Sequence, residues 1–214
     1  QSNQISLKNI VSGKFSENPE RSQYLKIAII MLISITCLSF VFQILQTSLP
    51  KTMDIRLSST MDLSTSEIGY IVSAIYIVSG LMNYVGGILA DKFSEKIIYA
   101  IGIVGQGCLL LLIISLSNYW LIILCLIIVA FNSSILPAEN LLLARFAPEK
   151  YQSLVYGIKF IISFSVGPIA LILISKSYEL TNEFSYLYLT SGVIMLLLFM
   201  VVLTLPVKKQ TLAA

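Results

Sequence analysis

Residues 86–96 read Gly-Gly-Ile-Leu-Ala-Asp-Lys-Phe-Ser-Glu-Lys and separate two long apolar runs. No charged residue occurs in the run before this charged segment, residues 68–90, or in the run after it, residues 97–117. Each run is long enough for a helix to cross the hydrocarbon layer of a bilayer, which takes about 20 apolar residues. Because so few residues join the runs, the sequence predicts two antiparallel transmembrane helices with a tight charged turn at the membrane surface.

The composition of the whole chain is that of an integral membrane protein. Of its 214 residues, 57% are hydrophobic and 12% are charged, whereas a soluble domain has about 25% charged residues. The chain has no histidine, which excludes histidine metal sites and Ser-His or Cys-His catalysis. Because Cys37, Cys108 and Cys125 lie singly in apolar runs, we expect no metal, no disulfide and no cofactor.

The hydropathy pattern predicts an all-α membrane domain over residues 25–206, between a polar leader, residues 1–24, and a tail, residues 207–214. The leader is expected to be a cytoplasmic linker with a short amphipathic helix at residues 5–11. Six transmembrane helices are expected in the membrane domain. Their predicted ranges are residues 24–49, 67–90, 97–117, 119–144, 152–175 and 184–205.

Local signals support the ends of these helices. Pro50 and Pro206 are expected to end the first and the last helix, because proline cannot continue a helix without the loss of a hydrogen bond. Ser64 and Glu67 have the spacing of a capping box at the start of the second helix. Polar loops are expected over residues 51–66 and 176–183.

Basic residues are unevenly distributed between the two ends of the predicted helices. Ten lie on the side that holds both chain ends: Lys8, Lys14, Arg21, Lys26, Lys92, Lys96, Arg145, Lys150, Lys208 and Lys209. Three lie on the opposite side: Lys51, Arg56 and Lys176. Since loops rich in Lys and Arg stay in the cytoplasm, both termini are predicted to be cytoplasmic in a multi-pass protein of the cell membrane.

Two of the predicted cytoplasmic loops resemble loops of the major facilitator superfamily. Its signature reads Gly-x-Leu-x-Asp-Arg/Lys-x-Gly-Arg-Arg/Lys, and the positions that match it are Gly87, Leu89, Asp91, Lys92 and Lys96. Ser94 and Glu95 replace a glycine and a basic residue. Residues 144–157 look like the family's loop between the fourth and fifth helices. The resemblance covers residues 25–206 and implies half of a twelve-helix transporter, with the substrate site between the two halves.

The polar leader is similar to the linker between the halves of such a transporter, and the tail is short. We therefore expect the C-terminal half, in a chain that begins inside a longer protein whose N-terminal half is its partner. One motif favours the N-terminal half instead. Ser163, Gly167 and Pro168 resemble a Gly-Pro motif in the fifth helix of antiporter N-terminal halves, although the glycine pair that follows it in the family is absent.

Two ionisable residues inside the predicted helices are candidates for a functional site. Glu139 is about 20 residues, or about 30 Å, into the fourth helix, and Lys159 is about 10 Å into the fifth from the cytoplasm. An ion pair between them is therefore expected near the cytoplasmic side, where it would gate the inner side or take part in proton or substrate coupling. This depth places Glu139 near the cytoplasmic border, where we expect it to be hydrated. The alternative to the ion pair is that Lys159 extends to the interface and Glu139 contacts Arg145 or water.

The resemblance implies a different role for the charged segment. In the family the carboxylate of this turn clamps helices together on the cytoplasmic face while the transporter is open outward. By analogy Asp91, Lys92 and Lys96, with Gly87, are gate residues, and the alternative is a purely structural turn.

Polar residues recur at helical spacing and predict the faces of a cavity. Thr36, Ser39, Gln43 and Gln46 share a face of the first helix, and Tyr76 and Asn83 share one of the second. Asn132 lies near the middle of the membrane. The candidates to line a cavity are Thr36, Gln43, Gln46, Asn83 and Asn132. The alternative is that these side chains hydrogen-bond neighbouring helices.

Taken together, the sequence predicts a secondary active transporter of a small organic solute, with the proton gradient as energy source and the direction of transport open. No ATP-binding Gly-x-x-x-x-Gly-Lys-Ser/Thr loop occurs, and no Gly-x-Ser-x-Gly motif or intramembrane aspartate pair indicates an enzyme. The partners expected are the solute and lipids, not nucleic acid. The remaining alternative is a self-contained six-helix protein that acts as a homodimer or as a scaffold without transport.

Overall fold

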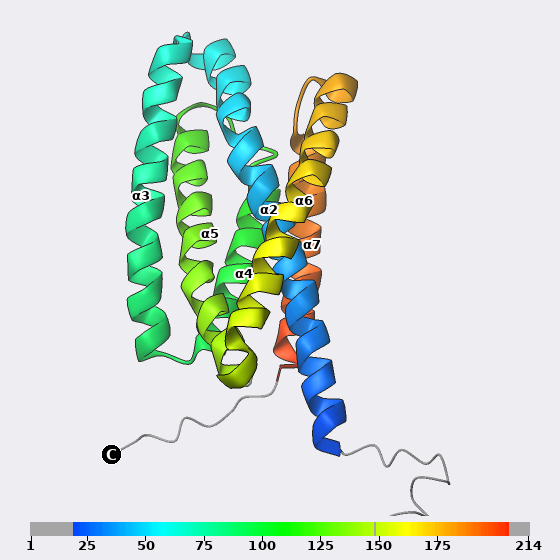
Figure 1. The fold of residues 1–214 in the computed structure, drawn as a ribbon. Helices are drawn as coiled ribbons and strands as arrows, with labels where there is room; N and C mark the ends of the chain where they lie inside the picture. Colours follow the sequence, from blue (N-terminus) through cyan, green and yellow to red (C-terminus); the bar gives the residue numbers. More distant parts are fainter. Residues whose placement is uncertain (1–18, 148, 206–214) are drawn as a thin grey trace, which may run out of the picture.

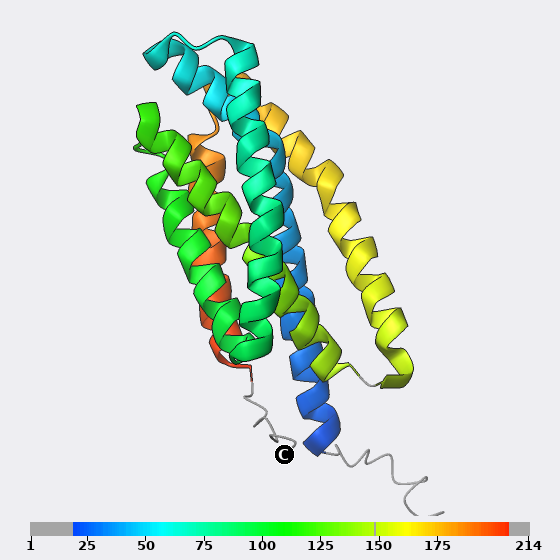
Figure 2. The ribbon, with the colours of Figure 1, turned by 90° about the vertical axis from the view of Figure 1, so that its left-hand side faces the viewer.

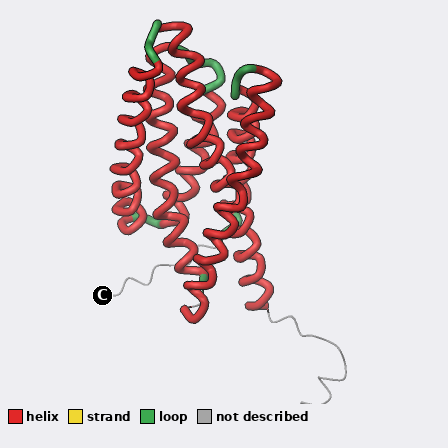
Figure 3. The backbone as a smooth tube through the Cα atoms, turned by 45° about the horizontal axis from the view of Figure 1, so that its top comes forward, coloured by secondary structure: helices red, strands yellow, loops and turns green. Residues whose placement is uncertain are grey.

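In the computed structural model of the chain, residues 19–147 and 149–205 are described, and their regular elements are all helices (Figure 1, Figure 3). Six helices of this described part are long and apolar enough to cross a membrane. They are α2 (Pro19–Met61), α3 (Thr65–Lys92), α4 (Glu95–Leu112), α5 (Asn118–Phe146), α6 (Gln152–Thr181) and α7 (Ser185–Leu203). A short 3₁₀ turn, η1 (Glu149–Tyr151), precedes α6. The prediction of an all-α, six-helix membrane fold is confirmed.

The helices run up and down, so that α2 begins at the end of the bundle where α7 ends (Figure 1). α3 packs mainly against α5, α4 against α5 and α7, and α2 against α6. α3 and α6 are the least covered of the helices, whereas more than half of the most apolar part of α5 is buried. Figure 2 shows α3 in front of the bundle and α6 at its side, each leaving a broad face uncovered by the rest of the chain.

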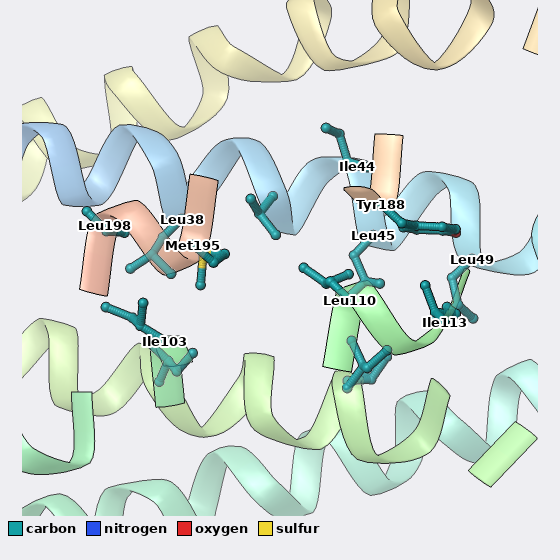
Figure 4. Packing of buried hydrophobic residues seen from close by; sticks show 14 of the residues in the cluster. Leu38, Ile44, Leu45, Leu49, Ile103, Leu110, Ile113, Tyr188, Met195 and Leu198 are labelled. Atoms are coloured by element: carbon teal, nitrogen blue, oxygen red, sulfur yellow. The ribbon is translucent and has the colours of Figure 1, made fainter. Parts of the chain in front are cut away.

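The hydrophobic core contains buried residues from all six helices, and Figure 4 shows its part between α2, α4 and α7. Leu45 and Leu49 of α2 lie beside Leu110 of α4 and Tyr188 of α7 in this view. Burial of large aliphatic and aromatic side chains on these three helices gives the bundle its close packing.

The prediction that Pro50 ends the first helix is wrong, because α2 continues through Pro50 to Met61. A proline at position 50 has no N–H to donate to the carbonyl of Gln46, one turn earlier. The hydroxyl of Tyr76 on α3 donates a hydrogen bond to that carbonyl instead, at 3.0 Å. Proline is tolerated inside membrane helices when a neighbouring helix satisfies the freed backbone group in this way.

Replacement of Tyr76 by Phe should therefore destabilise α2 at Pro50. The expected loss is about 1 kcal/mol, the net value of a typical hydrogen bond, measured by thermal unfolding in detergent. The control is the same substitution in a Pro50→Ala background, where residue 50 regains an N–H that can donate to Gln46. Equal losses in both backgrounds would contradict this role for Tyr76.

Other helix ends differ in smaller ways from those predicted. α6 continues to Thr181, so the loop predicted at residues 176–183 shrinks to residues 182–184, while α4 ends at Leu112 and a turn follows it. The capping box of α3 is confirmed, with Ser64 and Glu67 each accepting a hydrogen bond from the backbone N–H of the other. The predictions for residues 5–11 and for Pro206 fall outside the described residues.

At the end of the bundle away from the start of α2, each of the three connections contains, or is directly followed by, one residue with a left-handed backbone. These are Asp62 (φ 56°), Asn118 (φ 62°) and Asn182 (φ 54°). Asp and Asn tolerate this conformation better than other residues with a side chain. Short connections of this kind hold the antiparallel helices at a fixed spacing.

Gly86, the first residue of the charged segment, brings α3 against α5. A methyl group at Gly86 would lie 2.7 Å from the backbone Cα and carbonyl oxygen of Ser134 on α5. Nothing lies within 4 Å of the same position on Gly87. The close approach of the two helices therefore requires a glycine at residue 86, next to the glycine of the loop signature.

Near the C-terminal end of α2, the Arg56 side chain contacts the turn after α4, the loop before α7 and the first residue of α7. Its Nη1 donates to the carbonyl oxygens of Ile113 and Leu116, at 2.6 and 3.2 Å, in the turn after α4. Its Nη2 donates to the Glu183 carboxylate at 3.3 Å and to the Ser185 hydroxyl at 3.0 Å. The guanidinium thus satisfies carbonyls at the C-terminal end of α4, where a positive charge is favourable, and holds the start of α7.

This contact predicts a pH dependence of stability. The hydrogen bond that Ser185 donates, and then the charge of Arg56, hold the pKa of Glu183 below its ordinary value. Because the folded pKa is the lower one, the stabilisation is present above the unfolded pKa, about 4.3, and is lost as the pH falls through the folded pKa. With 46% of the Glu183 side chain exposed, we expect less than about 1 kcal/mol.

The measurement is the melting temperature of wild type and Glu183→Gln between pH 7 and pH 3. Wild type should be the more stable at pH 7, and the difference should vanish in acid. A difference that stays constant over this range would contradict the role of the Glu183 carboxylate.

Candidate functional site

A cavity of about 330 Å³ lies between α2, α3, α5 and α6, on the less covered side of the bundle. Its polar lining consists of Ser39, Gln43, Asn83, Asn132, Glu139, Asn140, Lys159 and Ser163. Its apolar lining consists of Leu38, Phe42, Ile135, Leu136, Phe160 and Phe164. The mixture of polar groups and aromatic rings in one concave wall is typical of a small-molecule site.

The two ionisable candidates meet at this cavity. Lys159 Nζ of α6 lies 2.7 Å from Glu139 Oε2 of α5 and also donates to Asn140 Oδ1 at 2.6 Å. Glu139 is seven residues from the end of α5 and Lys159 seven residues from the start of α6, which is about 10 Å along each helix. Because α5 and α6 are antiparallel neighbours and the two residues lie at the same depth, their side chains meet. The predicted ion pair is present.

The surroundings of the pair differ from those of the alternative prediction. Glu139 is 2% exposed and Lys159 is 7% exposed, so neither lies at a hydrated border or extends to the interface. Arg145, the other expected partner of Glu139, instead contacts Glu95 at 2.5 Å. Because protein covers most of both side chains, their attraction is stronger than that of an exposed ion pair.

The cavity wall has hydrogen-bonding groups that the described residues leave unused. Glu139 Oε1 is buried and has no hydrogen-bond partner among them. Within this described part, the side-chain amides of Gln43, Asn83 and Asn132 also form no hydrogen bond to another protein group. Glu139 and Asn132 are buried, Gln43 is half-buried and Asn83 is exposed. Buried polar groups are costly unless they are satisfied, and all four side chains are available to a solute or to water.

Three of the five residues predicted to line a cavity do so: Gln43, Asn83 and Asn132. The other two do not. The Thr36 hydroxyl donates to the carbonyl of Leu32 in its own helix, at 2.8 Å. Gln46 is exposed, and only its backbone carbonyl has a structural role, as the acceptor for Tyr76. Gln46 is only about one helical turn from Gln43, yet it lies outside the cavity lining.

Several cavity residues were not predicted from the sequence. Asn140 is next to Glu139 and shares Lys159 with it. Ser163 of α6 hydrogen-bonds Ser39 of α2 at 2.7 Å. Phe160 and Phe164 stack with their ring centroids 6.4 Å apart. The spacing of Lys159, Ser163 and Gly167 along α6 is a helical stripe that could have indicated this face.

A second cavity, of about 340 Å³, lies between α2, α5 and α6, beside the first parts of α2 and α6. Its lining is aliphatic and aromatic except for Lys159, which also lines the polar cavity. Lys159 is the one residue that the two linings share. The ion pair therefore lies between the polar cavity and this second, apolar cavity.

The family model of the Major Facilitator Superfamily matches residues 24–213. The chain belongs to the major facilitator superfamily. It is accordingly a multi-pass membrane protein and a transporter of the major facilitator type. No match is found among curated proteins.

The loop signature of this major facilitator chain lies at the start of α4 and the end of α3. Asp91 and Lys92 are exposed, and neither forms a hydrogen bond or ion pair with the described residues. Lys96 Nζ donates to the carbonyls of Leu203, at 2.8 Å, and Leu205. Lys96 thus satisfies carbonyls at the end of α7, whereas the gate roles of the signature residues, Gly87 included, stay predictions.

Glu95, which departs from the loop signature of the family, has a structural partner. Its carboxylate is 8% exposed and pairs with Arg145, near the end of α5. A carboxylate in the first turn of α4 is also favoured by the helix dipole. The sequence contained this signal, because an acid replaces a basic residue of the signature in one loop and a basic residue, Arg145, lies near the other loop.

Among the described residues, no group of three or more His, Cys, Asp or Glu side chains could hold a metal ion. Cys37, Cys108 and Cys125 are free thiols.

Proposed function

We propose that the chain is the C-terminal six-helix half of a secondary active transporter. It would move a small organic solute across the cell membrane by alternating access, with protons as the coupling ion. The observation that carries this proposal is the buried ion pair of Glu139 and Lys159 in the wall of a polar cavity. The pattern of six membrane-length helices supports a transporter. The ion pair and the cavity support proton-coupled alternating access.

Ionisable side chains inside a membrane helix are costly and mark functional sites. A buried ion pair stabilises a fold no better, in general, than apolar side chains of the same volume. The side chains of Glu139 and Lys159 keep only 3% and 8% of their surface exposed, yet both line the cavity. This favours a role in transport, in which the pair opens when a solute or a proton binds, over a role in stability.

The uncovered faces of α3 and α6 are where we place the second six-helix unit. Gly69, Gly80 and Gly87 of α3 and Gly157 of α6 have open space beyond their Cα atoms. Small residues of this kind let membrane helices approach one another closely. Packing of a second unit against these faces would close the polar cavity between the two units, as in transporters built from two such repeats.

The exposed carboxylate of Asp91 is then available as a gate residue. We predict that Asp91→Asn lowers the transport rate about tenfold or more, because a neutral amide cannot hold the cytoplasmic ends together by charge in the outward-open state. Stability should stay within about 0.5 kcal/mol of wild type, since the side chain is on the surface. The measurement is uptake in vesicles with matched protein content. An unchanged rate would contradict the gate role.

The experiment that tests the proposal is solute-dependent proton flux. Purified full-length protein is reconstituted into liposomes that hold a pH-sensitive dye, and small organic solutes are added one at a time. We expect at least one solute to change the internal pH, and Lys159→Met to abolish the response. Solute movement without a pH change would remove proton coupling alone, whereas no movement of any solute would contradict the transport function.

A further inference from the structure

The charges around the polar cavity balance, and this balance limits the solutes that it can bind. Its lining contains one ammonium group, from Lys159, and one carboxylate, from Glu139, and no other charged side chain of the described residues. With both groups ionised, a solute with a single charge would pair with one of them and leave the other buried without a counter-charge. Because an unpaired buried charge is strongly unfavourable, the cavity disfavours singly charged solutes.

Both members of the ion pair have unused bonding capacity. Glu139 Oε1 has no hydrogen-bond partner among the described residues. Lys159 donates to Glu139 and to Asn140, which uses two of the three N–H bonds of its ammonium group. The carboxylate can therefore accept from a donor on the solute, and the ammonium can donate to an acceptor on it.

We infer that the transported solute is a zwitterion, an inference that rests on the transport function proposed above. Its ammonium group binds Glu139 and its carboxylate binds Lys159. Binding exchanges the internal ion pair for two ion pairs with the solute, so every buried charge keeps a partner of opposite sign throughout. A solute that carries only one of the two groups opens the ion pair but leaves one of its members without a counter-charge.

The remainder of the lining indicates the rest of the solute. Phe160 and Phe164 stack at an interplanar angle of 24°, and Phe42 adds a third ring to the wall. Aromatic faces of this kind bind apolar and aromatic groups. The volume of about 330 Å³ is at the small end of ligand cavities, about 300–1,000 Å³. The solute class is thus a single amino-acid-like zwitterion with an apolar or aromatic side chain.

The test uses three probes with the same phenyl-alkyl skeleton: L-phenylalanine, phenethylamine and 3-phenylpropionate. Purified full-length protein is titrated with each probe, and the shift in melting temperature gives its affinity. L-Phenylalanine should bind at least about tenfold more tightly than either singly charged probe. Equal or tighter binding of a singly charged probe, or no binding of any of the three, would overturn the inference.

Two variants separate charge pairing from mere stability. Glu139→Gln combined with Lys159→Met removes both charges without leaving one unpaired, and this variant should lose the preference for L-phenylalanine. The exchanged pair, Glu139→Lys with Lys159→Glu, should retain that preference, because a zwitterion can bind in the reverse direction. A preference that survives loss of both charges would overturn the inference. Dye-detected transport of a singly charged solute alone would overturn it too, and leave the transporter assignment standing.

Discussion

Replacement of Lys159 by Met should abolish transport and lower the stability of the protein. The substitution leaves the Glu139 carboxylate buried, 2% exposed, without the ammonium group that now lies 2.7 Å away. Loss of one member of a buried ion pair typically costs about 3–5 kcal/mol. The measurements are thermal unfolding in detergent and solute uptake in vesicles.

Two further variants show whether charge is the cause. Addition of Glu139→Gln to Lys159→Met removes the unpaired carboxylate, so we expect stability to recover substantially while transport stays absent. Lys176→Met is the matched control, because Lys176 is an exposed lysine of the same helix and its loss should change neither property. If Lys159→Met transported solute at the wild-type rate, the functional role of the pair would be wrong.

Replacement of Gly86 by Ala should be the most damaging single-methyl change in the charged segment. The new methyl group would lie 2.7 Å from backbone atoms of Ser134, and backbone cannot move aside as the end of a flexible side chain can. Overpacking costs about 1–3 kcal/mol, and we expect the upper end of that range because α3 and α5 must separate. The measurements are the melting temperature and the yield of monodisperse protein.

Gly87→Ala is the matched control, since nothing lies within 4 Å of the methyl position at this neighbouring residue of the same helix. We expect its stability to equal or slightly exceed that of wild type, because alanine favours a helix more than glycine does. Equal losses from both substitutions would show that helix propensity or the partner unit, and not contact with Ser134, sets the requirement.

The number of helices and their order could be predicted from the sequence because the cost of burying charge in lipid marks each helix end. The charged segment separates two of the helices in this way, and the polar loops separate the others. The end of α2 could not be predicted from Pro50 alone. The hydroxyl that replaces the missing N–H comes from Tyr76, on another helix, and only the packing of α3 against α2 places it there.

The site was predictable to the extent that it depends on depth and periodicity. Counting residues along two antiparallel helices was enough to bring Glu139 and Lys159 together. Periodicity indicated the right face of α2 for Gln43 but not for Thr36 or Gln46, because the cavity is shorter than the helix. The requirement for glycine at residue 86 and not at residue 87 depends on where α5 crosses α3, which local sequence does not contain.

Alternating access requires the polar cavity to open to one side of the membrane and then to the other. The direct measurement places a single cysteine at Asn83, in a protein whose three native cysteines are replaced, and applies a membrane-impermeant maleimide. Leu197→Cys, at an exposed position of α7 that we expect to face lipid, is the control and should not react. We predict that the cysteine at residue 83 reacts from both sides, in right-side-out and in inside-out vesicles alike. Reaction from neither side would contradict alternating access through this cavity.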